Sequence, residues 1–157
     1  MQIQTALLGE LNIEKTDIIA FPEAIPGFPE EKEFILIPLD EESPFYYLQS
    51  VKTKELCLII ANPFIFFPSY EIKLETEVIT KLEIEQKQPN IAIYTILTIP
   101  EDFKKATANL LAPIIININT KKGLQFISQN NDYNTKHFIF PQQNNSEDIK
   151  PATREEL

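Results

Sequence analysis

The chain has 157 residues, a hydrophobic fraction of 43% and a formal net charge of −9. This length is typical of one domain, and such a domain buries about 70% of the surface that its unfolded chain exposes, so it needs no disulfide or metal to hold it. The negative charge argues against direct nucleic-acid binding, because Lys and Arg supply most of the free energy of phosphate contacts. The same charge favours encounter with a basic protein partner, although solubility alone also explains it.

Short apolar segments separated mainly by prolines, of which the chain has 12, predict a mainly β fold. Alternation is clearest between Ile91 and Ile99, where every second position holds Ile, Thr or Leu. Many short strands at close spacing predict a small antiparallel β-barrel-like domain. We expect strands at residues 2–8, 17–21, 34–38, 45–50, 56–61, 69–74, 91–99, 113–119, 124–128 and 136–140.

One or two short helices are expected within this domain. Val78, Ile79 and Leu82 recur at helical spacing after Thr76, a residue type that caps helix N-termini. Residues 100–102 begin with Pro and continue with two acids, a pattern that favours a second helix start.

The sequence divides into one folded domain, residues 1–140, and a polar tail, residues 141–157. The tail holds too few apolar residues to offset the entropy of ordering, so we expect it to be mobile unless it orders on a partner. No signal peptide is visible, and no stretch approaches 18 consecutive apolar residues. With a single cysteine as well, these features predict a cytoplasmic protein that makes no membrane contact.

Candidate catalytic and metal-binding residues are few. His137 is the only histidine, and without a partner motif it fits a hydrogen-bonded strand residue better than a zinc ligand or base. Cys57 lies in an apolar segment and is expected to pack as a small buried side chain. The carboxylates fall at solvent-facing spacing, which disfavours a catalytic dyad, and three scattered glycines make no phosphate loop. We predict no enzymatic activity, no cofactor and no metal site.

The sequence FPEAIPGFP, which begins at Phe21, contains a turn signal. Pro26 and Gly27 suit the centre of a type II turn, because Pro presets the first torsion and Gly supplies a positive φ. Ile25 and Phe28 would then pack around the turn together with Phe21. Alternatively, the turn is a rigid exposed loop that offers Ile25 and Phe28 to a partner.

Two segments are rich in aromatic residues, PFYYLQS and NPFIFFPSY. In the first, Phe45 and Tyr47 face one side of a strand and Tyr46 faces the other, and an outward Tyr is a common interface residue. In the second, residues 64–67 lie between two prolines and are too apolar for a simple loop. They form either a buried connection or an exposed apolar patch for another protein.

Residues 107–125, TANLLAPIIININTKKGLQ, combine branched apolar side chains with regularly placed polar ones. The alternation puts Ile114, Ile116 and Ile118 on one face of a strand, and Gly123 is expected in a turn. The polar side chains beside them either complete hydrogen bonds within the sheet or contact a partner. They are Thr107, Asn109, Asn117 and Gln125.

Taken together, the motifs resemble those of the flagellar assembly factor FliW family, in the same order and spacing, over residues 1–140. The matching residues are Phe21 with Ile25-Pro26-Gly27-Phe28, Pro44-Phe45 with Leu48-Gln49-Ser50, Asn62-Pro63 with Tyr70, Thr107 with Asn109-Leu110, Ala112-Pro113-Ile114 and Asn117, and Gly123 with Gln125. Ala24 departs from the pattern, where Gly is expected. An Ala there predicts that this position does not require a positive φ.

The resemblance implies a small cytoplasmic β-rich protein, without enzymatic activity, that binds flagellin and the RNA-binding translational repressor CsrA. Binding to CsrA relieves repression of flagellin mRNA, and accumulating flagellin takes the protein away again. An acidic protein beside the basic RNA surface of CsrA repels phosphate over a Debye length of about 8 Å. We therefore expect antagonism that is not competitive with RNA.

For flagellin, we expect an apolar groove that holds an amphipathic helix, formed by residues 64–67 with Tyr46 and Ile25. The resemblance assigns no interface residues, so the candidates come from the motifs above. The candidate partner-binding residues are Ile25, Phe28, Tyr46, Ile65, Phe66, Phe67, Tyr70, Asn109 and Asn117. The alternative function is an OB-type barrel that binds single-stranded nucleic acid through aromatic side chains, which the negative charge disfavours.

Overall fold

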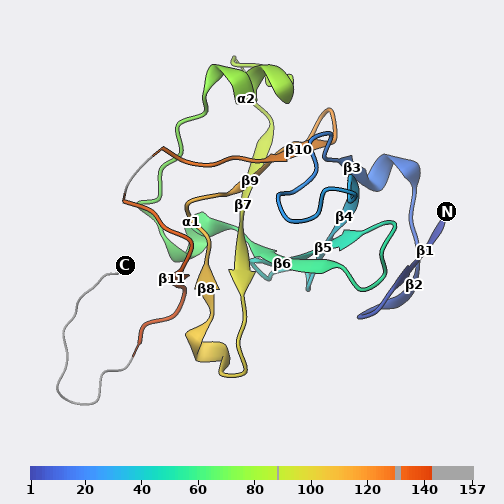
Figure 1. Ribbon diagram of the computed structural model, residues 1–157, viewed down its shortest axis with the longest axis horizontal. Helices are drawn as coiled ribbons and strands as arrows, with labels where there is room; N and C mark the ends of the chain where they lie inside the picture. Colours follow the sequence, from blue (N-terminus) through green and yellow to red (C-terminus); the bar gives the residue numbers. More distant parts are fainter. Residues whose placement is uncertain (88, 130–131, 143–157) are drawn as a thin grey trace.

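The fold is a closed barrel of seven strands with smaller elements packed around it (Figure 1). The computed structural model describes residues 1–87, 89–129 and 132–142. The ring follows the order β7-β6-β5-β4-β3-β10-β9, and β9 pairs with β7 to close it. Among the described strand pairs, β10–β3 alone is parallel. The predicted mainly β, barrel-like domain with short helices is confirmed, and its ring differs from the five-stranded OB barrel.

The barrel strands are short and follow the chain with one long interruption between β6 and β7. They are β3 (Ile18–Ala20), β4 (Glu33–Pro38), β5 (Phe45–Ser50), β6 (Cys57–Ala61), β7 (Ile91–Thr98), β9 (Ile114–Asn117) and β10 (Lys122–Gln125). The other strands are β1 (Gln2–Thr5), β2 (Gly9–Asn12), β8 (Thr107–Ala108) and β11 (His137–Phe138). The helices are α1 (Pro63–Phe66) and α2 (Thr76–Lys81), with 3-10 turns at Lys15–Asp17 and Phe103–Lys105.

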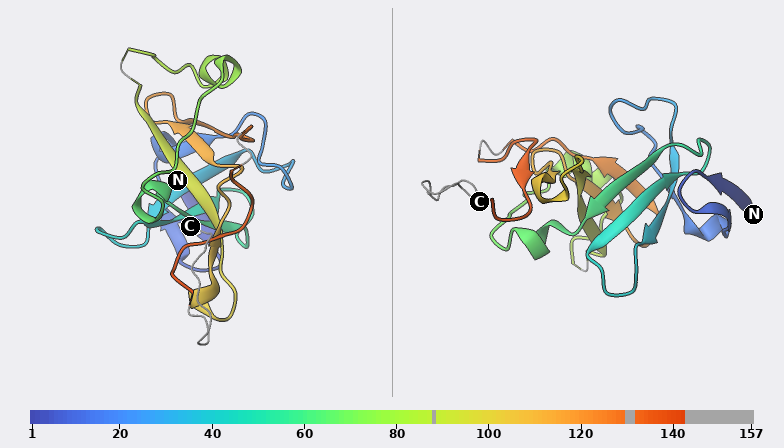
Figure 2. Two further views of the ribbon diagram at one scale, coloured as in Figure 1. Left: turned by 90° about the vertical axis from the view of Figure 1, so that its left-hand side faces the viewer. Right: turned by 90° about the horizontal axis from the view of Figure 1, so that it is seen from below.

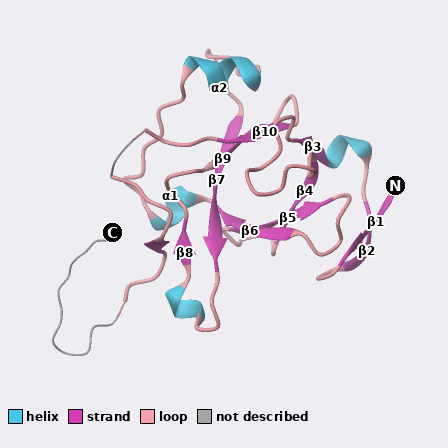
Figure 3. Cartoon of the chain, viewed as in Figure 1, coloured by secondary structure: helices cyan, strands magenta, loops and turns pink. Residues whose placement is uncertain are grey.

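The small elements lie at opposite sides of the barrel. The β1–β2 hairpin packs at one side, and α1, β8 and β11 lie at the other (Figure 2). Both helices sit outside the ring of strands, as the colouring by secondary structure shows (Figure 3). Within the described residues, neither helix is long enough to cross a lipid bilayer.

The barrel interior is filled by side chains that the period of two directs inward. Every barrel strand except β10 contributes, and the central residues include Phe21 and Leu48, which are fully buried. Strand β7 directs side chains to both of its faces. Ile96 packs on the interior cluster, whereas Ile93 packs outside the ring, on a second cluster, beneath α2, that includes Val78 and Leu82 of the α2 region.

Strand β9 is buried on both faces, which explains its unbroken run of isoleucines. Ile114 and Ile116 belong to the barrel interior, and Ile115 packs outside against Val78 and Leu82 of the α2 region. All four residues of β9 are buried. Ile118, which was expected to continue the inner face, lies instead in the following turn and is 43% exposed.

Several predicted elements need correction. The strand expected at residues 69–74 is wrong, because this segment pairs with no other strand among the described residues. Strands β2 and β8 were not anticipated, and the helix expected after residue 100 is a 3-10 turn. The α2 helix is confirmed, but its N-cap is Glu75 rather than Thr76. The predicted polar tail falls largely on residues 143–157, which lie outside the described residues.

The turn around Pro26 and Gly27 forms as predicted. The N–H of Phe28 donates to the carbonyl of Ile25 at 2.8 Å, and Gly27 has a φ of 95°, as a type II turn requires. The expectation for Ala24 is wrong: its φ is 61°, so the site does adopt the left-handed conformation. An L side chain there costs about 1–2 kcal/mol. Its methyl group is buried, which offsets part of this cost.

Gly123 lies within strand β10, not in a turn, and it is needed for steric reasons. A Cβ atom at this position would lie 2.6 Å from Cζ of Phe21. The Phe21 ring is fully buried and stacks edge-on against Phe34 at a centroid distance of 5.4 Å, so it has no free space into which to move.

We predict that Gly123→Ala lowers the free energy of unfolding by about 1–3 kcal/mol, because the added methyl group overpacks the barrel interior. Urea denaturation followed by circular dichroism measures this change. The double variant Gly123→Ala with Phe21→Leu should lose less than the sum of the two single changes, since the smaller side chain makes room. Strictly additive losses would contradict the steric explanation.

Candidate partner-binding surface

Helix α1 carries apolar side chains on two faces. Those on one face are exposed to solvent, and those on the other face pack against the domain. Asn62 caps it, since its side-chain oxygen accepts from the N–H of Phe64 at 2.9 Å, and Pro63 occupies the first turn. Phe64 is 39% exposed and Ile65 is 60% exposed. Phe66 is half-buried, with its ring 5.6 Å from that of Phe45. The segment is therefore both a packed connection and an exposed patch.

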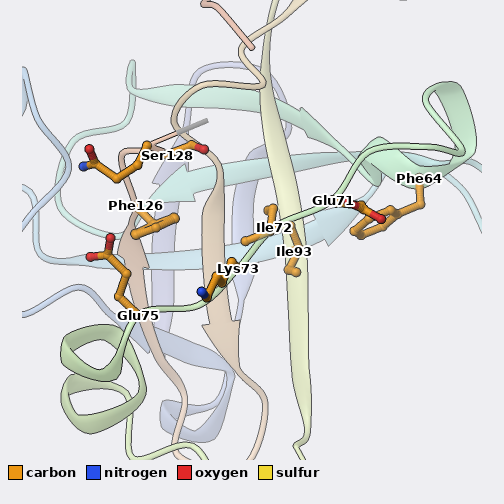
Figure 4. A pocket seen from close by; sticks show the side chains of 9 residues that line it. Phe64, Glu71, Ile72, Lys73, Glu75, Ile93, Phe126 and Ser128 are labelled. Atoms are coloured by element: carbon orange, nitrogen blue, oxygen red, sulfur yellow. The ribbon is translucent and has the colours of Figure 1, made fainter. Parts of the chain in front are cut away.

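A groove of about 820 Å³ begins beside Phe64 and runs along residues 71–75 (Figure 4). Apolar side chains from separate elements line it, namely those of Ile72, Ile93 and Phe126. Charged side chains also line it, namely those of Glu71, Lys73 and Glu75. An apolar surface edged by charges is suited to a peptide rather than to a small polar molecule.

A second hollow, of about 530 Å³, is lined by aromatic residues around His137. The Nε2 atom of His137 accepts from the N–H of Asn134 at 2.9 Å, as expected of a hydrogen-bonded strand residue. Burial lowers the pKa of His137, so the imidazole is neutral at pH 7. The rings of Phe67 and Tyr133 pack against it edge-on. Within the described residues, no three His, Cys, Asp or Glu side chains are grouped to hold a metal ion.

Three of the sequence-predicted site residues lie in the interior, which corrects their assignment to the surface. Ile25 is 1% exposed and belongs to the barrel core. Tyr70 is buried, and its hydroxyl donates to the carbonyl of Leu110 at 2.7 Å. Asn117 is also buried. Because other elements of the fold cover all three side chains, they cannot touch a partner in this conformation.

The remaining candidates are partly accessible and do not form one surface. Phe28 and Tyr46 are half-buried and pack on the barrel core, Tyr46 with its ring 5.2 Å from that of Tyr94. Tyr46 therefore faces inward, opposite to Phe45 and Tyr47 along β5. Phe67, like Phe66, is half-buried beside α1. Ile65 is the most exposed of the predicted residues.

Three of the four regularly spaced polar side chains of residues 107–125 make hydrogen bonds within the fold. Asn109 accepts from the N–H of Ala112 at 3.0 Å, and Gln125 donates to the carbonyl of Ala112 at 2.9 Å. The amide of Asn117 donates to the carbonyls of Leu82 and Glu83, and its oxygen accepts from two backbone N–H groups in the following turn. These three side chains therefore complete hydrogen bonds within the fold, which is the first of the two roles considered from the sequence, and not contact with a partner.

Not every carboxylate is merely solvated. The Glu31 carboxylate accepts from the hydroxyl groups of Ser50 and Thr53, both at 2.5 Å. These hydrogen bonds favour the charged form and lower the pKa of Glu31. The interaction fastens the loop before β4 to the turn after β5, and nothing in the sequence spacing indicates it.

Sequence analysis missed two exposed aromatic residues near α1. Phe103 is 49% exposed and Phe138 is 47% exposed. Phe103 stacks on Phe140 at 5.1 Å, and Phe140 in turn lies 6.2 Å from Phe66. A Phe within the polar stretch Glu101-Asp102-Phe103-Lys104-Lys105 is the one signal that could have indicated an exposed ring.

The closed ring of seven strands defines a small β-barrel protein, and comparisons identify its family. The sequence model of the FliW protein family matches residues 2–139. The chain is 51% identical to the flagellar assembly factor FliW of Syntrophomonas wolfei, over 99% of both chains. It is 45% identical to that of Bacillus subtilis, over 88% of this chain and 96% of the relative.

A solved structure agrees with the sequence comparisons. The crystal structure of a flagellar assembly factor FliW superposes with a TM-score of 0.85 at 43% identity, and the match covers 91% of this chain and 99% of that one. The chain belongs to the FliW family of flagellar assembly factors, and the resemblance read from the five motifs is confirmed.

We predict that Asn117→Ala lowers the free energy of unfolding by about 2–3 kcal/mol, because it leaves buried backbone groups at both ends of the amide without partners. Thermal or urea unfolding measures the loss. Asn119→Ala is the matched control: its side chain is exposed, and a change within about 0.5 kcal/mol is expected. An Asn117→Ala protein of unchanged stability would contradict the structural role.

Proposed function

We propose that this protein is a cytoplasmic flagellar assembly factor that binds flagellin and antagonises the translational repressor CsrA, relieving repression of flagellin mRNA. Its membership of the FliW family, at 51% identity over almost the whole chain, is the observation that carries the proposal. It acts by binding proteins and catalyses no reaction. The engagement of His137 by Asn134 and by neighbouring rings supports a structural role for the only histidine.

In this proposal, flagellin is held through apolar contacts at α1. An amphipathic helix buries its apolar face in a hydrophobic surface, and Phe64, which lines the groove, and the adjacent Ile65 are both exposed. Phe66 and Phe67 lie behind them and support the surface through the core. Tyr46 and Ile25, which were expected in the same groove, face the barrel interior instead.

We predict that Ile65→Ala weakens flagellin binding by about tenfold, because burial of an exposed Ile on binding contributes about 1.5 kcal/mol. Calorimetric titration with purified monomeric flagellin measures the affinity. Leu7→Ala is the matched control, since Leu7 is 61% exposed in the hairpin at the opposite side of the barrel. Equal affinities for the two variants would rule out α1 as the flagellin site.

CsrA, in this proposal, is bound by an acidic protein that excludes RNA without occupying the RNA site. The chain carries a formal charge of −9, and negative charge docked beside a basic RNA-binding surface raises the free energy of bound phosphate. Bulk beside the RNA groove or a change in the shape of CsrA contributes as well. The protein itself holds no nucleic acid.

We predict that this protein releases labelled flagellin-leader RNA from CsrA to an extent that excess RNA does not fully reverse, and that rising salt weakens the release. Fluorescence anisotropy at increasing RNA and salt concentrations measures both effects. Release that is abolished by excess RNA would establish plain competition. A gel shift of RNA by the protein alone would instead favour a nucleic-acid-binding barrel.

A further inference from the structure

Residues 71–75 form a strand-like segment without a neighbouring strand. Exposure alternates along it: Glu71, Lys73 and Glu75 are exposed, and Ile72 and Leu74 are half-buried against the cluster beneath α2. Such alternation at a period of two is that of an extended chain lying on a packed surface. This is why the sequence predicted a strand here.

The central backbone of this segment, at residues 72–74, is unpaired. The N–H of Glu71 donates to the hydroxyl of Tyr133 at 3.0 Å, but Ile72, Lys73 and Leu74 make no backbone hydrogen bond within the described part of the chain. The ring strands of the closed barrel have no free edges, so this segment offers unpaired backbone groups that the ring itself does not. Unpaired N–H and C=O groups in an extended row can pair with another chain.

The groove of about 820 Å³ follows this same segment. Its lining combines the backbone-exposing residues 71–75 with apolar side chains of β7 and of the segment after β10, namely Ile93 and Phe126. Figure 4 shows these side chains directed toward a common space beside Ile72 and Lys73. A strand laid here would gain backbone hydrogen bonds on one side and apolar contacts below.

We propose that this groove binds an extended segment of CsrA by β-strand addition along residues 71–75. The inference rests on the proposed function for the identity of the partner. Backbone pairing supplies affinity in this binding mode, and pockets for alternate side chains supply specificity. The incoming segment carries apolar side chains at every second position, facing Ile93 and Phe126, with basic side chains between them.

Backbone geometry and charge together favour CsrA over flagellin as the occupant. The segment contributes two carboxylates, Glu71 and Glu75, and one ammonium group, Lys73, on a chain of net charge −9. In the proposed function, flagellin docks through helical segments, which would not pair through their backbone. CsrA is bound away from its RNA site, so the occupant is an extended CsrA segment outside that site. The groove therefore complements a basic, extended chain better than an amphipathic helix.

Residue-resolved amide exchange tests the pairing directly in the wild-type protein with purified CsrA as the probe. Because the N–H groups of alternate residues in a strand point to the same side, CsrA should slow exchange at least tenfold either at Lys73 or at Ile72 and Leu74 together, but not at all three. Flagellin should leave these amides unchanged. Protection of them by flagellin in place of CsrA would overturn the assigned occupant.

A charge-reversal pair tests the groove independently. Glu71→Lys should weaken CsrA binding at least tenfold, whereas Glu55→Lys, which makes the same charge change at an exposed turn outside the groove, should weaken it less than threefold. If wild-type protein binds CsrA but shows no protection at residues 72–74 and equal effects of the two variants, the groove is not the site and the proposed function stands. If wild-type protein does not bind CsrA, both proposals fail.

Discussion

Strand β9 is the constraint on which the rest of the structure depends, because neighbours enclose it on both edges and both faces. β10 and β7 pair with its two edges, the barrel interior covers Ile114 and Ile116, and the α2 cluster covers Ile115. A polar side chain at any of its three isoleucine positions would leave a buried polar group without a partner. Where the strand ends, the amide of Asn117 turns to the carbonyl of Leu82 and joins the barrel to the chain after α2.

Closure of the barrel decides where a partner can bind. A ring without free edges leaves backbone pairing with another chain to the elements outside the ring. The longest of these connects β6 to β7, which are antiparallel neighbours, and it carries α1, residues 71–75 and α2. In our proposals the surfaces for flagellin and CsrA meet at Phe64, which belongs to α1 and also lines the groove. Two partners that share this side chain cannot both occupy it.

Local patterns in the sequence predicted the parts of this fold that local physics determines. The alternation from Ile91 onward and the Pro26-Gly27 turn both formed, because side-chain period and backbone torsions are properties of neighbouring residues. Residues 71–74 show why the rest was not predictable: their pattern is that of a strand, but whether a strand has a partner depends on distant segments. Burial of Ile25 and Tyr70 likewise depends on packing that no local motif states.

The single parallel pair also sets the order in which the protein can be completed. Ala20 of β3 lies beside Lys122 of β10, so the seam joins the first barrel strand in the chain to the last. The ring therefore cannot close on a nascent chain until β9 and β10 have emerged from the ribosome. Contacts between such distant segments form slowly, and open sheet edges are prone to aggregate. Any sheet that forms earlier keeps unpaired edges until β9 and β10 close the seam.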